Sequence, residues 1–186
     1  MITLYHGSNV DIQEIDLCRS KRGKDFGCGF YLNANKQQAF DMALRTTRML
    51  MKGEPIINTY LFDDTILQSN TDLNIKVFDD YSPEWAEFVL MNRNNNTDTP
   101  THPYDIVIGP IADDTVGVQI RRFVNGYIPM NTLIEELRFR GNHGSEPWRV
   151  FRPVEQCTEQ RTGGCPFFET ECHLSGIDSE QCRDCQ

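Results

Sequence analysis

The chain of 186 residues lacks any long hydrophobic run. No stretch approaches the about 18 consecutive apolar residues of a transmembrane helix. The first residues also lack the basic region and apolar run of a secretion signal. We therefore expect a cytoplasmic protein without membrane contact, although delivery as an effector stays open. Basic charge is scarce too: the formal net charge is −9, which disfavours non-specific binding to nucleic acid or to anionic membranes.

The sequence also lacks a glycine-rich fingerprint after a predicted strand, which disfavours a dehydrogenase-type NAD site. What is present is ordinary for a soluble globular protein, with 39% hydrophobic and 24% charged residues. A chain of this length can bury a stable core without disulfides or bound metal ions. Its patterns predict both strands and helices, and we expect a mixed α+β fold. The predicted strands are residues 2–5, 28–32, 56–62, 104–108 and 148–151, with a short one at 12–15, and the predicted helices are residues 35–52, a short one from 83, 114–125 and 131–139.

Cysteine is unevenly distributed, since five of the seven cysteines lie at or after Cys157. An odd count without an export signal argues against a disulfide framework. Together with the loss of aliphatic residues, this divides the chain into a main domain, residues 1–152, and a cysteine-rich tail or mini-domain, residues 153–186.

The tail has one cysteine pair at the short spacing that zinc sites use, Cys182 and Cys185. With Cys165 and Cys172 they form a candidate four-thiolate zinc set, in which His173 or Cys157 could substitute. A second such pair is missing, so a tail with free thiols is the alternative.

Two short segments near the start carry side chains suited to holding a ligand. His6 lies in Tyr5-His6-Gly7-Ser8, and Tyr31 lies in Gly29-Phe30-Tyr31-Leu32. The glycines allow another molecule to approach the backbone closely, because they have no Cβ. Taken singly, a histidine after a strand or a Phe-Tyr pair within one is usually structural.

In combination the two segments resemble ADP-ribosyltransferases whose three signature residues are His, Tyr and Glu. In that group a strand ends in His-Gly-Ser/Thr, and a later Gly-x-Tyr-Phe/Leu leads through small polar residues into a helix. Here the matching stretches are residues 6–8, 29–32 and 33–35. Residues 2–152 are most similar to a bacterial group of small domains in that superfamily, which also shares the stretch at 104–112.

The resemblance implies a split β-sandwich of two small sheets with flanking helices around an NAD cleft. It implies an NAD-dependent enzyme that transfers a single ADP-ribose to a macromolecular acceptor, expected to be protein, and releases nicotinamide. His6 would bond the adenosine ribose, the Gly7 backbone would hold the carboxamide, and Tyr31 would stack on the nicotinamide ring. The implied NAD-binding set is His6, Gly7, Ser8, Gly29, Phe30, Tyr31 and Asn33.

The third signature position departs from the pattern. Glu146 is the best candidate for the catalytic acid, with Glu155 as the alternative. The bacterial group often carries Gln near this point, and an acid before a strand is often only a turn residue. An NAD- or ADP-ribose-binding module, or an NAD glycohydrolase, therefore remains an alternative function, and a zinc-dependent interaction protein is a third. We expect the side chains of His6, Tyr31 and Glu146 to line one pocket.

A cluster of basic residues lies between the two segments: Arg19, Lys21, Arg22 and Lys24. It has two interpretations, a solvated loop or a loop that faces the pyrophosphate of NAD.

Overall fold

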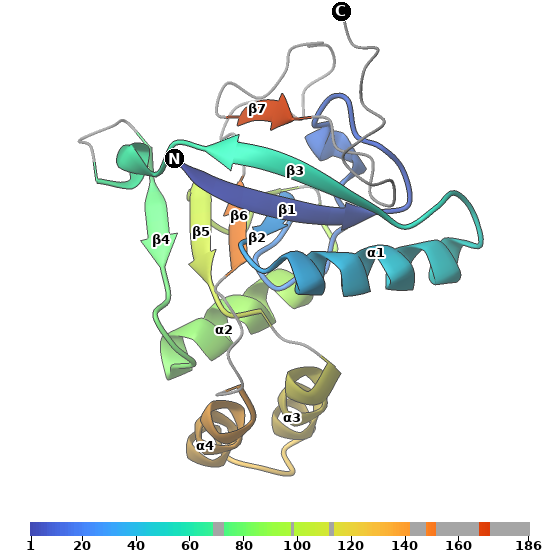
Figure 1. Cartoon of the computed structure of the whole chain (residues 1–186). Coiled ribbons are helices and arrows are strands. Elements are labelled where there is room, and N and C mark those ends of the chain that lie inside the picture. The colour runs from blue at the N-terminus through green and yellow to red at the C-terminus, as the bar shows by residue number, and fades with distance from the viewer. Residues whose placement is uncertain (69–72, 98, 112–113, 142–147, 152–167, 172–186) are drawn as a thin grey trace, which may run out of the picture.

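The computed structural model describes residues 1–68, 73–97, 99–111, 114–141, 148–151 and 168–171. The described part is mixed helix and strand, which confirms the α+β prediction (Figure 1). Its strands are β1 (Ile2–Ser8), β2 (Phe30–Asn33), β3 (Ile56–Phe62), β4 (Ile75–Val77), β5 (Ile106–Gly109), β6 (Trp148–Phe151) and β7 (Phe168–Glu171). Its helices are α1 (Lys36–Leu50), α2 (Pro83–Arg93), α3 (Asp114–Val124) and α4 (Met130–Gly141), with short 3₁₀ turns at Leu17–Arg19 and Asp64–Leu67.

The strands hydrogen-bond in the order β4-β5-β6-β2-β1-β3-β7. Among these described strands, β4 and β5 are the pair that runs parallel, and the other pairs are antiparallel. The two central strands, β1 and β2, meet at a single residue pair, Tyr5 with Asn33, whereas all of β1 pairs with β3. Beyond that junction β1 and β3 run across the direction of β5 and β6 (Figure 1). The described strands thus form one hydrogen-bonded sheet whose two parts meet at this junction, and the split β-sandwich implied by the resemblance stays a prediction.

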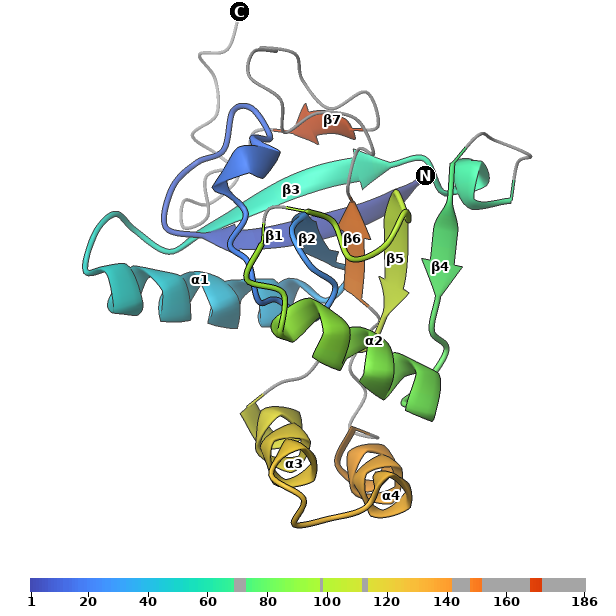
Figure 2. The ribbon, with the colours of Figure 1, turned by 180° about the vertical axis from the view of Figure 1, so that it is seen from behind.

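Side chains alternate between the two faces of β2, because successive residues of a strand point in opposite directions. Tyr31 belongs to a core cluster with residues of α2, α3 and α4, and these helices lie together on one side of the molecule (Figure 2). Phe30 and Leu32 belong to a second cluster, which contains residues of β1, β3 and β5. Strand β2 therefore contributes to both cores.

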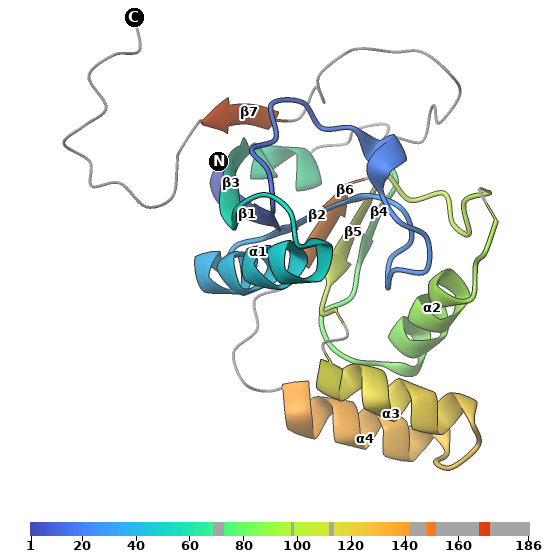
Figure 3. The same ribbon diagram turned by 90° about the vertical axis from the view of Figure 1, so that its right-hand side faces the viewer.

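Helix α1 packs directly on β1 (Figure 3). Asn35 caps its first turn, and its side-chain oxygen accepts from the backbone N–H of Gln37 at 2.9 Å and of Gln38 at 3.3 Å. Asn35 is therefore the N-cap of α1. The close packing requires a glycine in β1, because a Cβ on Gly7 would lie 1.9 Å from the carbonyl oxygen of Ala39.

The resemblance segment at 104–112 contains β5, whose four residues are all buried. Just after it, the Pro110 carbonyl accepts a hydrogen bond of 2.8 Å from the Trp85 indole of α2. Packing requires a glycine at position 109, because a Cβ added there would come within 3.0 Å of the Phe78 side chain. This segment therefore fixes α2 against the sheet.

Several predicted elements need correction. Residues 12–15 form no strand; Ile12 and Ile15 instead pack on the second core cluster from a loop. Strands β4 and β7 were not predicted. Strand β7 lies within the predicted tail but pairs with β3 along its four residues, so part of that segment belongs to the edge of the sheet. In the ranges given above, no helix combines the length and the apolar character needed to cross a bilayer.

Candidate functional site

His6 lies where β1 and β2 part, just beyond the Tyr5–Asn33 pair. Its Nδ1 is 2.8 Å from the carbonyl oxygen of Tyr31. Burial lowers the pKa of His6 to about 4, outweighing the bond to Tyr31, which raises it; nearby Lys24 lowers it further. The ring is therefore neutral at pH 7. Because a carbonyl only accepts, the single ring proton is on Nδ1, and Nε2 keeps a lone pair for an outside donor.

An aromatic neighbour fixes the plane of this imidazole. The His6 ring stacks on Phe30, with centroids 4.4 Å apart and planes 22° apart. Phe30 in turn makes an edge contact with Tyr60 at 5.4 Å. The His6 ring is thus held from β2 in two ways, by the Phe30 ring and by the Tyr31 carbonyl.

Tyr31 is buried, with 9% of its surface exposed. Its hydroxyl donates to the Gly27 carbonyl at 2.8 Å and accepts from the Phe26 N–H at 3.1 Å. The Lys24 ammonium lies over the ring, 4.5 Å from its centroid. The ring is therefore fixed at its hydroxyl end, and the ammonium covers one of its faces.

The loop before β2 is closed by hydrogen bonds at both ends. The Gly27 N–H donates to the Lys24 carbonyl at 3.1 Å, a tight turn in which Gly27 takes φ +78°, a conformation that favours glycine. The Ser20 hydroxyl accepts from the Gly29 N–H at 2.8 Å and donates to the Gly29 carbonyl at 3.0 Å. The loop therefore holds a fixed shape around the Tyr31 hydroxyl.

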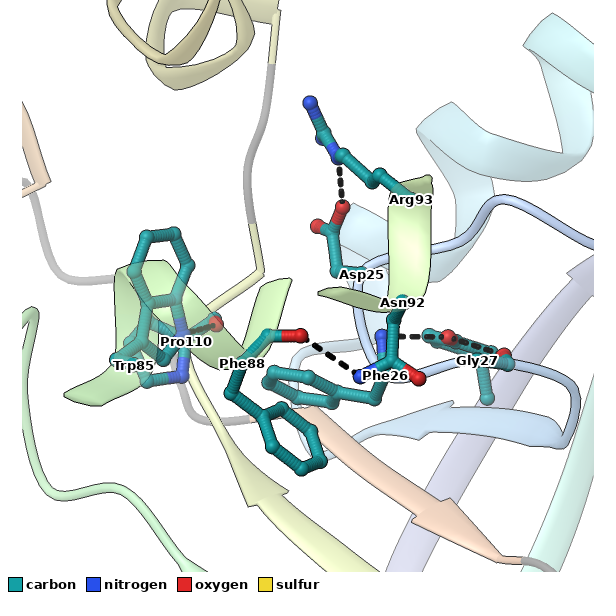
Figure 4. Close-up of polar contacts among 9 residues, drawn as sticks. Asp25, Phe26, Gly27, Trp85, Phe88, Asn92, Arg93 and Pro110 are labelled. Carbon is teal, nitrogen blue, oxygen red and sulfur yellow. Dashed lines mark hydrogen bonds and ion pairs between the residues drawn. The ribbon is translucent and has the colours of Figure 1, made fainter. Parts of the chain in front are cut away.

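Helix α2 anchors the same loop from outside (Figure 4). Arg93 Nε donates to the Asp25 carboxylate at 2.6 Å, with the Asp25 side chain only 9% exposed. Phe26 is fully buried, and its backbone carbonyl oxygen lies 3.1 Å from His102 Nε2. The position of Tyr31 thus depends on residues from α2 and from the loop before β5.

Lys24 is the residue of the basic cluster that lies over the Tyr31 ring. Burial lowers its pKa; nearby Cys28 opposes this, and nearby Lys21 adds to it. Within the described residues no carboxylate pairs with its ammonium. The same charge affects the pKa of His6. Lys24 therefore contacts Tyr31, and its charge also acts on the imidazole of His6.

The other members of the cluster face outward. Arg19 forms a surface ion pair with Asp16 at 3.2 Å, and Arg22 donates to the Asn96 carbonyl at 3.1 Å. Lys21 is exposed. The solvated-loop interpretation describes these three residues, and Lys24 differs from them.

The remaining predicted NAD-binding residues have structural partners. The Ser8 hydroxyl accepts from the Val10 N–H at 3.4 Å. Asn33 is fully buried, and its amide donates to Gln38 Oε1 at 2.8 Å, at the start of α1. Gly29 is held by Ser20, as described above. Contact of any of these groups with NAD stays a prediction.

Glu146 and Glu155 lie outside the described residues, as do Cys165, Cys172, Cys182 and Cys185. The predicted third catalytic residue and the predicted zinc set therefore stay predictions. Strand β6, which follows Glu146, does pair with β2, and Val150 stands opposite Tyr31. Across the described ranges, no group of three or more His, Cys, Asp or Glu side chains is placed to hold a metal.

The structure thus brings together His6 and Tyr31 through one hydrogen bond. Their rings are directed differently: the His6 ring stacks on Phe30 of the second core cluster, whereas the Tyr31 ring belongs to the first. The shared pocket expected from the sequence stays a prediction. The sequence signalled Lys24 only as one of four basic residues, and it gave no signal for Arg93 or Ser20 as supports of the loop.

Residues 2–144 match a family model described as "Protein of unknown function (DUF3990)", so the chain belongs to this family. No curated protein and no solved structure matches the chain.

Proposed function

We propose that the protein is an NAD-dependent ADP-ribosyltransferase that transfers one ADP-ribose to a macromolecular acceptor, with a protein side chain as that acceptor. The bond between ribose C1′ and the nicotinamide nitrogen breaks, and nicotinamide leaves neutral with the electron pair. A nucleophile of the acceptor forms the new bond to C1′ and gives up its proton. Because the transition state is loose and cationic, the protein contributes mainly by positioning NAD and stabilising positive charge.

The observation that carries this proposal is the state of His6. Its ring is neutral and is fixed through Nδ1 to the Tyr31 carbonyl. The remaining lone pair on Nε2 suits a ribose hydroxyl, which donates a hydrogen bond. A neutral imidazole also adds no positive charge beside the nicotinamide cation.

Tyr31 supports the same assignment. Its ring is held at the hydroxyl end, and one face already has a cation over it, Lys24. A face that attracts an ammonium also attracts the flat, positively charged nicotinamide ring. In this proposal the Gly7 backbone holds the carboxamide, and Glu146 bonds a hydroxyl of the nicotinamide ribose and stabilises the cation.

The first experiment incubates the purified protein with NAD and follows free nicotinamide by mass spectrometry. Tyr31→Leu removes the stacking ring, and Tyr31→Phe keeps it, so the proposal predicts loss of nicotinamide release in the first and substantial retention in the second. Thermal unfolding of both variants controls for folding, since both lose the hydroxyl bonds. Equal activity in wild type and Tyr31→Leu would contradict the proposal.

The second experiment separates transfer from binding. Glu146→Gln keeps the size of the side chain and removes its charge, and Glu155→Gln is the matched control. We expect the first to abolish nicotinamide release while NAD still binds, and the second to retain activity. Tight NAD binding by wild type without any release would instead favour the binding module. Release without labelling of an acceptor would favour NAD hydrolysis.

A further inference from the structure

The electrostatic environment of Lys24 favours the binding of an anion. Its ammonium is partly withdrawn from water, over the Tyr31 ring, and burial lowers its pKa. In the described part of the chain it has no carboxylate partner, and the charge of Lys21 lowers its pKa further. Burying a cation in this way is unfavourable unless it is paired. Among the described residues, an ammonium without a carboxylate partner makes a positive site inside a chain of net charge −9.

The backbone around Lys24 is held by hydrogen bonds, whereas its ammonium lies against the face of an aromatic ring. The turn is closed by the Gly27 N–H on the Lys24 carbonyl, and the next residue, Asp25, is tied to Arg93. The Lys24 ammonium lies over the Tyr31 ring, without a carboxylate partner among the described residues, and lysine has a long, flexible stem. It can therefore leave the ring without disturbing the loop.

We propose that Lys24 binds a phosphate group of the dinucleotide and, by moving to it, exposes the face of Tyr31 on which nicotinamide stacks. This inference rests on the proposed function. The ammonium and the nicotinamide cation compete for the same aromatic face, because both are positive. A phosphate on the same ligand gives the ammonium a better partner, a charge-assisted hydrogen bond. Lys24 thereby couples recognition of the diphosphate to stacking of the ring.

The coupling makes Lys24 a residue that selects the intact dinucleotide. Nicotinamide alone has no phosphate to bind the Lys24 ammonium, so the ammonium stays over the Tyr31 ring and blocks stacking. ADP-ribose has the diphosphate but no nicotinamide, so it depends on Lys24 without using the Tyr31 face. The three ligands therefore report on different parts of the same site.

The test is calorimetric titration of NAD, ADP-ribose and nicotinamide into the wild-type protein and two variants, Lys24→Met and Lys21→Met. Lys24→Met keeps the length of the side chain and removes the charge, whereas Lys21→Met removes a neighbouring exposed charge as the matched control. We expect Lys24→Met to weaken NAD and ADP-ribose binding by about 10- to 100-fold, the usual effect of losing a hydrogen bond to a charged group. Nicotinamide alone should bind as well as before or better. Lys21→Met should change each affinity by less than about threefold.

A third variant, Lys24→Arg, keeps the positive charge and should recover much of the lost affinity. If Lys24→Met binds NAD and ADP-ribose as tightly as wild type, or more tightly, Lys24 is only a cover on the ring and the inference is wrong. The same conclusion follows if Lys24→Arg binds as weakly as Lys24→Met. If wild type binds neither NAD nor ADP-ribose, the proposed function itself fails and this inference fails with it.

Discussion

The Nδ1 atom of His6 lies 2.8 Å from the carbonyl oxygen of Tyr31, across the point where β1 and β2 part. The two strands share only the Tyr5–Asn33 pair, so this side-chain bond links them beyond the last backbone pair. The residue that joins the two parts of the sheet is thus also the residue expected to contact the ribose. Stability and function should depend on the same imidazole.

The first prediction concerns the pH dependence of folding. The pKa of His6 is about 4 in the folded protein, against an ordinary value of 6.5. Between these values the unfolded chain binds more protons than the folded one, so the free energy of unfolding decreases as the pH falls through this window. The stabilisation that comes from the neutral His6 ring is present above pH 6.5, and about 2–3 kcal/mol of the free energy of unfolding is lost by pH 4.

The measurement is urea unfolding between pH 4 and 7 for wild type and His6→Gln. Glutamine hydrogen-bonds but does not titrate, so the variant should lose less stability than wild type over this range. The comparison cancels the contributions of the carboxylates and of the other histidines. Parallel curves for the two proteins would show that the His6 pKa is not lowered.

Much of the fold was predictable because its signals are local. Helix α1 follows from the capping Asn35 and from Ala39 and Ala43, which recur on its buried face. Helix α2 follows from Ser82 and the proline after it, and β3 from its run of β-branched and aromatic residues. Strands β4 and β7 are three and four residues long and depend on partners far along the chain, so no local pattern revealed them.

The site was predictable in part for the same reason. His6 and Tyr31 lie in short motifs that are visible in the sequence. The inward direction of Lys24 cannot be read from the sequence. It depends on the turn at Gly27, on the hydrogen bonds between Ser20 and the Gly29 backbone, and on packing against Tyr31. Glycine at position 7 suggested contact with a ligand, but the structure gives it a packing role against α1.

The second prediction concerns the cap of α1. Asn35→Ala removes the acceptor for the N–H groups of Gln37 and Gln38. The free energy of unfolding should fall by about 1 kcal/mol, the usual effect of losing a helix cap. Asn35→Asp keeps the acceptor and should stay near wild type. Equal stability of all three proteins in urea unfolding would mean that the cap contributes nothing.

The third prediction compares two glycines. Gly7→Ala would place a methyl group 1.9 Å from the Ala39 carbonyl, so α1 has to move away from β1. We expect a loss of more than about 3 kcal/mol, or failure to fold. Gly117→Ala is the matched control, since it lies within α3 and its Cβ meets only arginine side-chain tips at 3.9 Å. That variant should gain about 0.5–1 kcal/mol, and an equal loss in both variants would contradict the packing argument.

The last prediction concerns the ion pair that anchors the Tyr31 loop. Arg93→Met removes the guanidinium that binds the Asp25 carboxylate at 2.6 Å, with side chains 27% and 9% exposed. Leaving a buried charge without this partner should reduce the free energy of unfolding by about 3 kcal/mol. Arg19→Met breaks an exposed pair, 83% and 50% exposed, and should cost less than about 1 kcal/mol.

Because Phe26 and Gly27 of the same loop bond the Tyr31 hydroxyl, Arg93→Met should also slow nicotinamide release at a temperature where it remains folded. If it is destabilised but releases nicotinamide at the wild-type rate, the loop does not position Tyr31 for the reaction.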